Sequence, residues 1–90
     1  MNSVEMKIDD LKFAEYNPRK ISSKEMIKLK NSLKEFGFVQ SIIINQDNTI
    51  VGGHQRVKAA RELGMIKVPC VTVDLDKEKE KALNIALHRS

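Results

Sequence analysis

Five consecutive residues of this chain have the types and spacing best suited to chemistry: Gly52, Gly53, His54, Gln55 and Arg56. Two β-branched residues precede them and a helix-forming run follows, so we expect a strand-to-helix junction. The first turn of a helix presents backbone N–H groups without intrahelical partners, and the helix dipole adds positive charge there. Glycine lets a ligand approach the backbone closely, and arginine grips phosphate in a bidentate manner. The junction therefore predicts an anion site suited to phosphate.

The same junction also has a purely structural interpretation. Gly52 and Gly53 would then allow a sharp bend, and the polar side chains after them would simply be exposed to solvent. Short patterns of this kind recur by chance, and the stretch matches neither the Walker loop nor the dinucleotide-binding fingerprint. From the spacing alone, both interpretations stay open.

His54 is the candidate general acid or base of the junction, because histidine titrates near neutrality. No Asp or Glu in the motif is placed to orient it, so we prefer a ligand-contacting or helix-capping role. Two histidines and one cysteine without metal-ligand spacing argue against a zinc site. Asp74 and Asp76 fit a helix N-terminal cap better than a cation site. We therefore assign no catalytic residue and no metal site, with His54 kept as a candidate.

The elements that position the junction follow from apolar patterning and turn residues. Strands are expected at 4–9, 39–45, 49–52 and 67–75, and helices at 22–36, 54–63 and 76–90. This order predicts an α+β fold, a small mixed β-sheet covered by helices. The last helix has much apolar surface and no stop signal, which predicts that residues 1–90 are one domain of a longer chain.

The first helix carries the strongest local signals. Ser22 and Glu25 form a capping box, and Gly37 ends the helix. Its apolar stripe is interpreted as core and not as a binding groove: Met26, Leu29, Leu33 and Phe36. The run from Asp76 to Lys81 alternates in charge and is interpreted as a solvated face.

Composition restricts the class of protein more than its function. The chain has 90 residues, 41% of them hydrophobic, and no apolar run near the roughly 20 residues that span a bilayer. The amino terminus has no signal-peptide pattern, and the one cysteine, Cys70, lies in an apparent buried strand, so we expect a cytoplasmic protein with Cys70 in the core. The net charge of +4 permits nucleotide or nucleic-acid partners without requiring them.

Four stretches taken together resemble the ParB amino-terminal domain, also called the ParB-like nuclease or ParB/sulfiredoxin fold. They are "YNPRK", "LKNSLKEFGFVQSIII", "IVGGHQRVKAARELG" and "VPCVTVDL". The resemblance covers residues 4 to about 88 and looks closest to the domains of phage, mobile elements and DNA methyltransferase-associated proteins. It implies the fold given above and a site at the glycine junction.

The family's Gly-Glu-Arg-Arg box, which binds the triphosphate of CTP with magnesium, falls on four residues here. Gly53 and Arg56 match it, whereas His54 replaces the glutamate and Gln55 replaces the first arginine. Because that first arginine carries the family's DNA-clamping behaviour, the resemblance does not carry clamping over to this chain.

Further correspondences extend the implied pocket. Arg19 matches an early arginine that faces the same pocket, and Gln40 matches a glutamine after the first helix, although Ser41 replaces the usual proline. A later family box is approximated only by Asn84 and Arg89. The helix-turn-helix that reads a centromere-like DNA site has no counterpart in these residues.

The sulfiredoxin branch has a loop resembling "GGCHR", whose cysteine performs the chemistry. His54 stands at that position and Cys70 lies on a different strand, so we do not expect sulfiredoxin activity.

The resemblance implies a domain that binds nucleotide, CTP or another triphosphate, or nucleic-acid phosphate, in a DNA partition, plasmid, phage or DNA-modification system. Backbone N–H groups, Gln55 and Arg56 would hold the phosphates, Arg19 would close the pocket, and Mg²⁺ would arrive with the nucleotide. Nucleotide, DNA or both are the expected partners, near the nucleoid or a plasmid and with no membrane. The resemblance is compatible with a homodimer and with further domains beyond Ser90. Two alternatives stay open: a nuclease or nucleotide hydrolase, and a protein-interaction module without nucleotide.

Overall fold

The structure, a computed structural model, describes residues 2–16 and 20–87 of the chain. The elements in chain order are β1 (Val4–Lys7), a 3-10 turn (Ile8–Asp10), α1 (Ser23–Phe36), β2 (Ile42–Asn45), β3 (Ile50–Gly52), α2 (His54–Glu62), β4 (Lys67–Val73) and α3 (Lys77–Leu87). The predicted order of strands and helices is confirmed, and so is the α+β class. None of the helices described has the length and apolar character needed to cross a bilayer.

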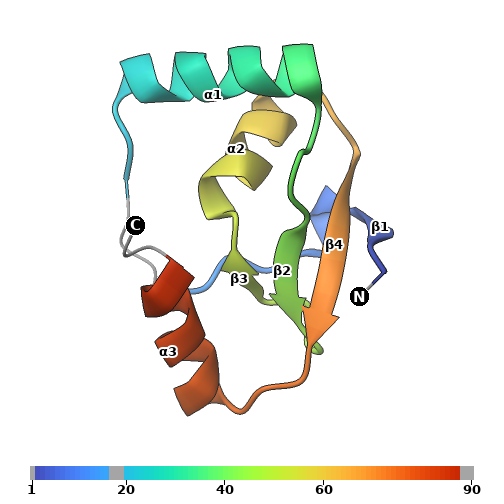
Figure 1. Cartoon of the computed structure of the whole chain (residues 1–90), viewed down its shortest axis with the longest axis vertical. Helices are drawn as coiled ribbons and strands as arrows, with labels where there is room; N and C mark the ends of the chain where they lie inside the picture. Colours follow the sequence, from blue (N-terminus) through green and yellow to red (C-terminus); the bar gives the residue numbers. More distant parts are fainter. Residues whose placement is uncertain (1, 17–19, 88–90) are drawn as a thin grey trace.

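The described residues form a four-stranded sheet in the order β1-β4-β2-β3. β4 pairs antiparallel with β1 and parallel with β2, and β2 and β3 form an antiparallel hairpin, so the sheet is mixed as predicted. Pro69 is tolerated in the central strand β4 because pairing with β2 begins one residue later, at Cys70. In Figure 1, α1 crosses one end of the molecule above α2, and α3 lies toward the other end beside β3.

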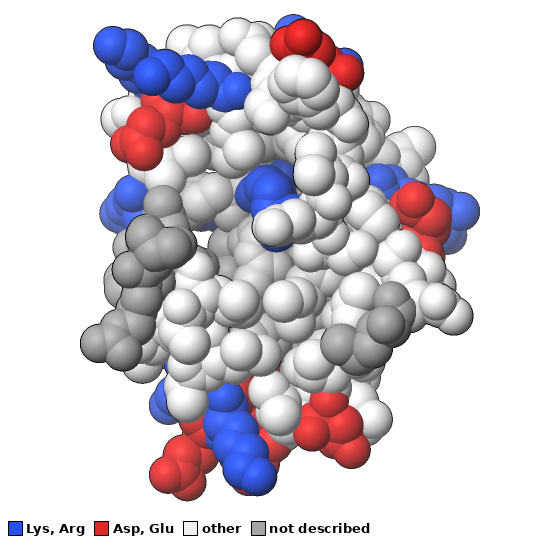
Figure 2. All heavy atoms as spheres, in the orientation of Figure 1, with Lys and Arg blue, Asp and Glu red and all other residues white. Residues whose placement is uncertain are grey.

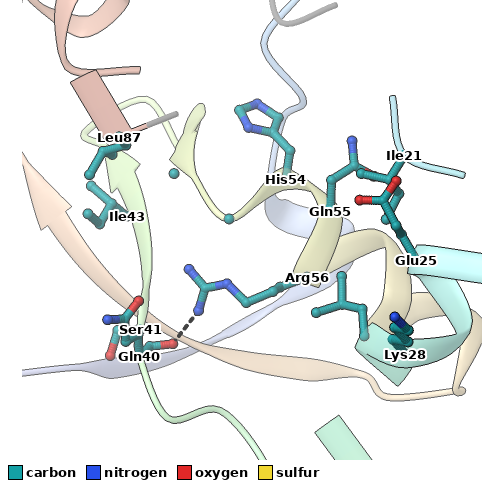
Figure 3. Close-up of a pocket in the computed structure, with 13 residues that line it drawn as sticks. Ile21, Glu25, Lys28, Gln40, Ser41, Ile43, His54, Gln55, Arg56 and Leu87 are labelled. Atoms are coloured by element: carbon teal, nitrogen blue, oxygen red, sulfur yellow. Dashed lines mark hydrogen bonds between the residues drawn. The ribbon is translucent and has the colours of Figure 1, made fainter. Parts of the chain in front are cut away.

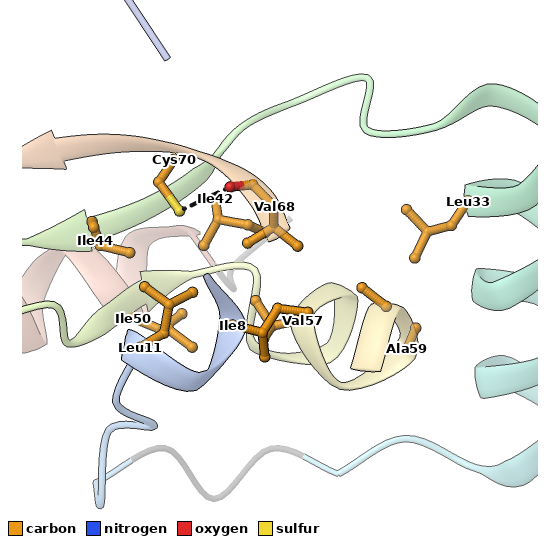
Figure 4. Close-up of a cluster of buried hydrophobic side chains, with 11 residues drawn as sticks. Ile8, Leu11, Leu33, Ile42, Ile44, Ile50, Val57, Ala59, Val68 and Cys70 are labelled. Atoms are coloured by element: carbon orange, nitrogen blue, oxygen red, sulfur yellow. Dashed lines mark hydrogen bonds between the residues drawn. The ribbon is translucent and has the colours of Figure 1, made fainter. Parts of the chain in front are cut away.

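The core lies between the sheet and the helices α1 and α2. The fully buried residues there are Ile42 and Ile44 of β2, Ile50 of β3, and Val57, Ala59 and Ala60 of α2 (Figure 4). The small alanine side chains let the α2 backbone pack closely against its neighbours. This packing fixes the position at which α2 begins, and therefore the position of the glycine junction.

The local signals of the first helix are confirmed. Ser22 Oγ accepts a hydrogen bond from the Glu25 backbone N–H at 3.1 Å, and Glu25 Oε1 accepts one from the Ser22 N–H at 3.3 Å. Gly37 follows the helix with a positive φ of 69°. This reciprocal cap sets the start of α1, whose first turns face the junction.

Several predictions of burial and extent were wrong. Phe36 is 66% exposed, because the stripe reaches the core only through Met26, Leu29 and Leu33 and the last turn of α1 lies beyond it. The first strand ends at Lys7, where a 3-10 turn begins, and β2 starts only at Ile42. Glu80, within the run interpreted as a solvated face, is fully buried.

Candidate anion-binding pocket

The glycine junction has the predicted strand-to-helix geometry. β3 ends at Gly52, and Gly53 is the N-cap residue of α2 with a left-handed backbone, φ 103° and ψ 19°. The first helical bond runs from the Val57 N–H to the Gly53 carbonyl at 3.0 Å. The N–H groups of residues 54–56 therefore have no acceptor within α2 and form the positive end of its dipole.

Gly53 is required by its backbone conformation and close contacts, and Gly52 is closely packed. A Cβ on Gly53 would lie 2.5 Å from Ile42 Cδ1 and 2.9 Å from Arg56 Nη2, in addition to the strain of its positive φ. A Cβ on Gly52 would lie 2.7 Å from Leu87 Cδ1, at the end of α3. The junction is thus packed from both sides, and Gly53 lets the Arg56 side chain pass directly over the backbone.

Arg56 points into the pocket and is anchored by a neutral partner. Its Nη1 donates a hydrogen bond to the backbone carbonyl of Gln40 at 2.5 Å (Figure 3). Within residues 2–16 and 20–87, no carboxylate forms a salt bridge with Arg56. Burial lowers the pKa of the Arg56 guanidinium from its usual value, yet arginine stays protonated in proteins. A half-buried cation with no counter-ion among the described residues is therefore held at the junction.

The pocket beside Arg56 has a volume of about 750 Å³, within the range of small-molecule sites. Figure 2 shows a hollow in the middle of this face, with a Lys or Arg side chain at its border and acidic side chains gathered mainly toward the two ends. The walls come from the start of α1, the segment entering β2, the glycine junction and the end of α3. The cavity can therefore hold a ligand that has an anionic end and an apolar body.

Six of the seven predicted binding residues line this pocket: Gln40, Gly52, Gly53, His54, Gln55 and Arg56. The seventh, Arg19, lies outside the described residues, as does Arg89 of the later family box. Asn84, the other residue of that box, is buried and donates from Nδ2 to the Val51 carbonyl at 2.9 Å. It thus contacts the backbone just before the glycines.

The side chain of His54 is directed away from Arg56 (Figure 3). It is 4% exposed, and its Nε2 accepts a long hydrogen bond from the Ala14 N–H at 3.4 Å. Its ring lies 6.1 Å from that of Phe13, centroid to centroid. The cap position of α2 belongs to Gly53, so the imidazole packs the segment of residues 13–14 against the start of the helix instead of capping it.

Sequence reasoning missed the walls that α1 and α3 supply. Lys28 brings a second cation to the pocket, and Ile21, Leu29 and Leu87 bring apolar surface. Leu29 had been interpreted as core alone, whereas it both packs against the core and lines the pocket. No local motif marks these residues, because they reach the pocket only through the docking of their helices on α2 and β3.

Metal-binding and thiol chemistry find little support in the described part of the chain. No group of three or more His, Cys, Asp or Glu side chains is placed there to hold a metal ion. Glu25, the carboxylate of the pocket wall, is engaged in the cap of α1. Cys70 is 1% exposed, as predicted for a core residue, and burial raises the pKa of its thiol to about 11.

Comparisons with known proteins agree with this geometry. The sequence pattern described as the ParB N-terminal domain matches residues 1–90. A protein of Acidianus two-tailed virus, ORF326b, is 35% identical over 75 residues, which cover 82% of this chain and 23% of that protein. A probable chromosome-partitioning protein ParB of Campylobacter jejuni is 32% identical over 85 residues, which cover 90% of this chain and 31% of that protein. The chain thus spans a third or less of these relatives.

Solved structures show the same fold. C-terminally truncated ParB of Caulobacter crescentus, complexed with CTP-gamma-S, has a TM-score of 0.86 and 26% identity, covering 100% of this chain and 55% of that one. Sulfiredoxin from Arabidopsis thaliana has a TM-score of 0.75 and 18% identity, covering 90% of this chain and 94% of that one, a likeness of fold alone. The match over the whole sequence, the relatives and the fold together show that the chain belongs to the ParB N-terminal domain family.

Proposed function

We infer that this domain binds the phosphates of a nucleoside triphosphate in the pocket at residues 52–56, with CTP as the first candidate. The observation that carries the inference is the Arg56 guanidinium, which lies half-buried beside the start of α2 with a carbonyl as partner and no carboxylate among the described residues. CTP is named because the structurally similar ParB was solved with CTP-gamma-S. The wider setting that we propose is a partition, plasmid, phage or DNA-modification system.

Different residues of the pocket are proposed to contact different parts of the nucleotide. The N–H groups of residues 54–56 and the Arg56 guanidinium donate to phosphate oxygens, an arrangement typical of anion sites at helix starts. Gln55 and Lys28 line the same cavity and supply further donors, and Gln40 places Arg56. Arg19 remains part of the proposal as the residue that closes the pocket. The apolar wall, which includes Ile21 and Leu87, suits the less polar part of the nucleotide.

The described lining of this pocket contains no protein-built site for magnesium. Glu25 is the carboxylate of the described lining, and it already holds the cap of α1. The metal would therefore be held by the phosphates themselves, and we assign no step to it.

The placement of His54 favours binding over catalysis. A general base must reach the proton that it removes, whereas the imidazole is buried against Ala14 and directed away from Arg56. This observation weighs against hydrolase and nuclease roles for His54. The alternative of a protein-interaction module without nucleotide is tested by measuring ligand binding.

Thermal melting with CTP-gamma-S, ATP or duplex DNA, each with and without Mg²⁺, tests the proposal. A ligand at 100 times its Kd stabilises the fold by about 2.7 kcal/mol, which raises the melting temperature of a domain of this size by roughly 10–20 °C. We expect CTP-gamma-S to raise the melting temperature of the wild type and to have little effect on Arg56→Ala. A shift with duplex DNA alone, steeply reduced by salt, would assign the pocket to nucleic-acid phosphate instead. No shift with any ligand would support the interaction module.

A further inference from the structure

Glu80 is a carboxylate with no exposed surface, on the first turns of α3. Its Oε2 accepts a hydrogen bond from the Tyr16 hydroxyl at 2.8 Å. Its Oε1 accepts from Asn45 Nδ2 at 2.7 Å and from Lys77 Nζ at 3.3 Å. A buried carboxylate is costly unless donors surround it, and these donors come from three separate segments of the chain. Glu80 therefore joins parts of the fold that the sequence keeps far apart.

Asn45 extends this cluster to the segment between β4 and α3. Its Nδ2 also donates to the Leu75 carbonyl at 2.8 Å, and its Oδ1 accepts from the Leu75 N–H at 3.1 Å. The same Oδ1 accepts from the Gln46 N–H at 2.9 Å. Because Asn45 is the last residue of β2, these bonds fasten the beginning of α3 to the end of that strand.

The far end of α3 reaches the pocket. Asn84 donates to the Val51 carbonyl at 2.9 Å, and Leu87 packs so closely over Gly52 that a Cβ there would lie 2.7 Å from its Cδ1. Leu87 also lines the cavity (Figure 3). An α-helix behaves as a rigid element over two or three turns, so a displacement of α3 at Glu80 moves Leu87 relative to Gly52.

Tyr16 holds Glu80 from a segment five residues before Ile21 in the sequence. The chain runs from Tyr16 through residues 17–20 to Ile21, which lines the cavity. The Tyr16 hydroxyl is held by Glu80, and the Nζ of the exposed Lys81 lies 5.7 Å from the centroid of the Tyr16 ring. One buried carboxylate thus joins Tyr16 to the helix that ends at Leu87.

We propose that Glu80 is a positioning residue of the pocket: its hydrogen bonds to Tyr16 and Asn45 hold α3 so that Leu87 keeps its place over the glycine junction. It does not line the cavity and would not touch the ligand. The proposal rests on the nucleotide-binding function inferred above, and it adds that binding depends on a side chain outside the pocket.

Two variants test this role. Tyr16→Phe removes one hydrogen-bond donor at a partly exposed position and should fold, and Glu80→Gln keeps the size of the side chain while removing its charge. Lys81→Ala is the matched control, because Lys81 also contacts Tyr16 but makes no hydrogen bond to Glu80. The Kd for CTP-gamma-S is measured by calorimetry at a temperature where every variant is folded. Amide hydrogen exchange of residues 52–57 is measured without ligand.

We expect Tyr16→Phe and Glu80→Gln each to weaken CTP-gamma-S binding by about fivefold or more, the lower bound of typical coupling between sites. The double variant should bind no more weakly than the weaker single one, because both changes break the same connection. Both should speed hydrogen exchange at the junction, and Lys81→Ala should change neither quantity. Folded variants that melt at a lower temperature but keep the wild-type Kd would overturn the proposal, leaving Glu80 a stabilising residue only.

The hydrogen-exchange measurement separates this proposal from the proposed function. If the wild type does not bind CTP-gamma-S, the nucleotide function fails, and exchange at residues 52–57 decides the role of Glu80 alone. Faster exchange in the two variants would still support the positioning role, whereas unchanged exchange would refute it.

Discussion

Arg56 and Gln40 are joined by a hydrogen bond of 2.5 Å from the guanidinium Nη1 to the backbone carbonyl. The bond connects the first turn of α2 to the segment that enters β2 and directs the guanidinium along the cavity (Figure 3). Because the acceptor is a neutral carbonyl, the positive charge of Arg56 is oriented without being neutralised. An anion entering the pocket therefore meets a cation that is already in place, which lowers the conformational cost of binding.

Gly53→Ala should destabilise the fold more than an ordinary loop substitution. The new Cβ would meet Ile42 Cδ1 at 2.5 Å and Arg56 Nη2 at 2.9 Å, at a residue whose φ is 103°. We expect a loss of about 2–3 kcal/mol in the free energy of unfolding, from strain together with overpacking. Urea unfolding measures the loss.

Gly64→Ala is the matched control for this substitution. Gly64 also has a positive φ, 81°, but a Cβ there has nothing within 4 Å. Its substitution should cost only the left-handed strain of about 1 kcal/mol. Equal losses at Gly53 and Gly64 would show that the close packing of the junction contributes nothing.

Asn45→Ala should destabilise the domain strongly. The substitution removes a donor to Glu80 and both hydrogen bonds to Leu75, and it leaves a buried carboxylate short of a partner. Each unsatisfied buried group costs about 1–3 kcal/mol, so we expect a total loss of about 3 kcal/mol or more. Gln46→Ala, at the exposed neighbouring residue, is the control and should change the unfolding midpoint little. A small effect of Asn45→Ala would mean that water replaces these bonds.

Acid should weaken the fold through Glu80. Burial by itself raises the pKa of the Glu80 carboxyl, but hydrogen bonds from Asn45, Tyr16 and Lys77 outweigh it and hold the pKa below the usual 4.5. A folded-state pKa below the unfolded one means that the unfolded chain binds more protons, so this stabilisation is present above about pH 4.5 and is lost as the pH falls through the lowered value. If urea unfolding is measured from pH 7 downward, the urea concentration at the midpoint should begin to decrease at about pH 4.5.

Glu80→Gln isolates this contribution, because the amide takes up no proton in the same range. Its midpoints should decline less steeply than those of the wild type in acid. The pKa of Asp47 is also lowered, by its hydrogen bonds to Lys77 and Thr49, but Asp47 is present in both proteins. If the midpoints of the two proteins decrease equally steeply in acid, the pKa of Glu80 is the same in the folded and unfolded states.

Cys70 should be unreactive in the native domain. Its side chain is 1% exposed, its Sγ donates to the Val68 carbonyl at 3.6 Å, and burial raises the pKa of the thiol to about 11. Because the thiolate is the reactive form, we expect a thiol reagent at pH 8 to modify Cys70 only after unfolding in urea. Rapid modification of the native protein would contradict its place in the core.

Local signals predicted local structure well. The capping box at Ser22 and Glu25, the stop at Gly37 and the bend at Gly53 depend on residues close in sequence, and each lies where it was expected. Phe36 and Glu80 were misjudged because their exposure depends on which distant segment covers them. Glu80 has the charge pattern of a surface residue, and its donors Tyr16 and Asn45 come from distant parts of the sequence.

Only part of the candidate site, too, could be predicted from the sequence. The residues of the junction are contiguous, so one motif revealed them together with their chemistry. Lys28 and Leu87 join the pocket through the docking of α1 and α3, for which the sequence contains no short-range pattern. The burial of the His54 ring against Ala14 and Phe13 likewise comes from a segment 40 residues away.

Isothermal titration of CTP-gamma-S into the wild type, Arg56→Ala and Arg61→Ala tests whether the Arg56 guanidinium binds the nucleotide. Arg61 is the control, because it lies on the same helix but stacks on Phe13, with its Cζ 5.1 Å from the ring centroid, and does not line the pocket. We predict that Arg56→Ala weakens binding by at least about tenfold, because one charge-assisted contact of about 1.5–3 kcal/mol is lost, while Arg61→Ala binds as the wild type does. Equal Kd values for Arg56→Ala and the wild type, or equal losses in both variants, would contradict it.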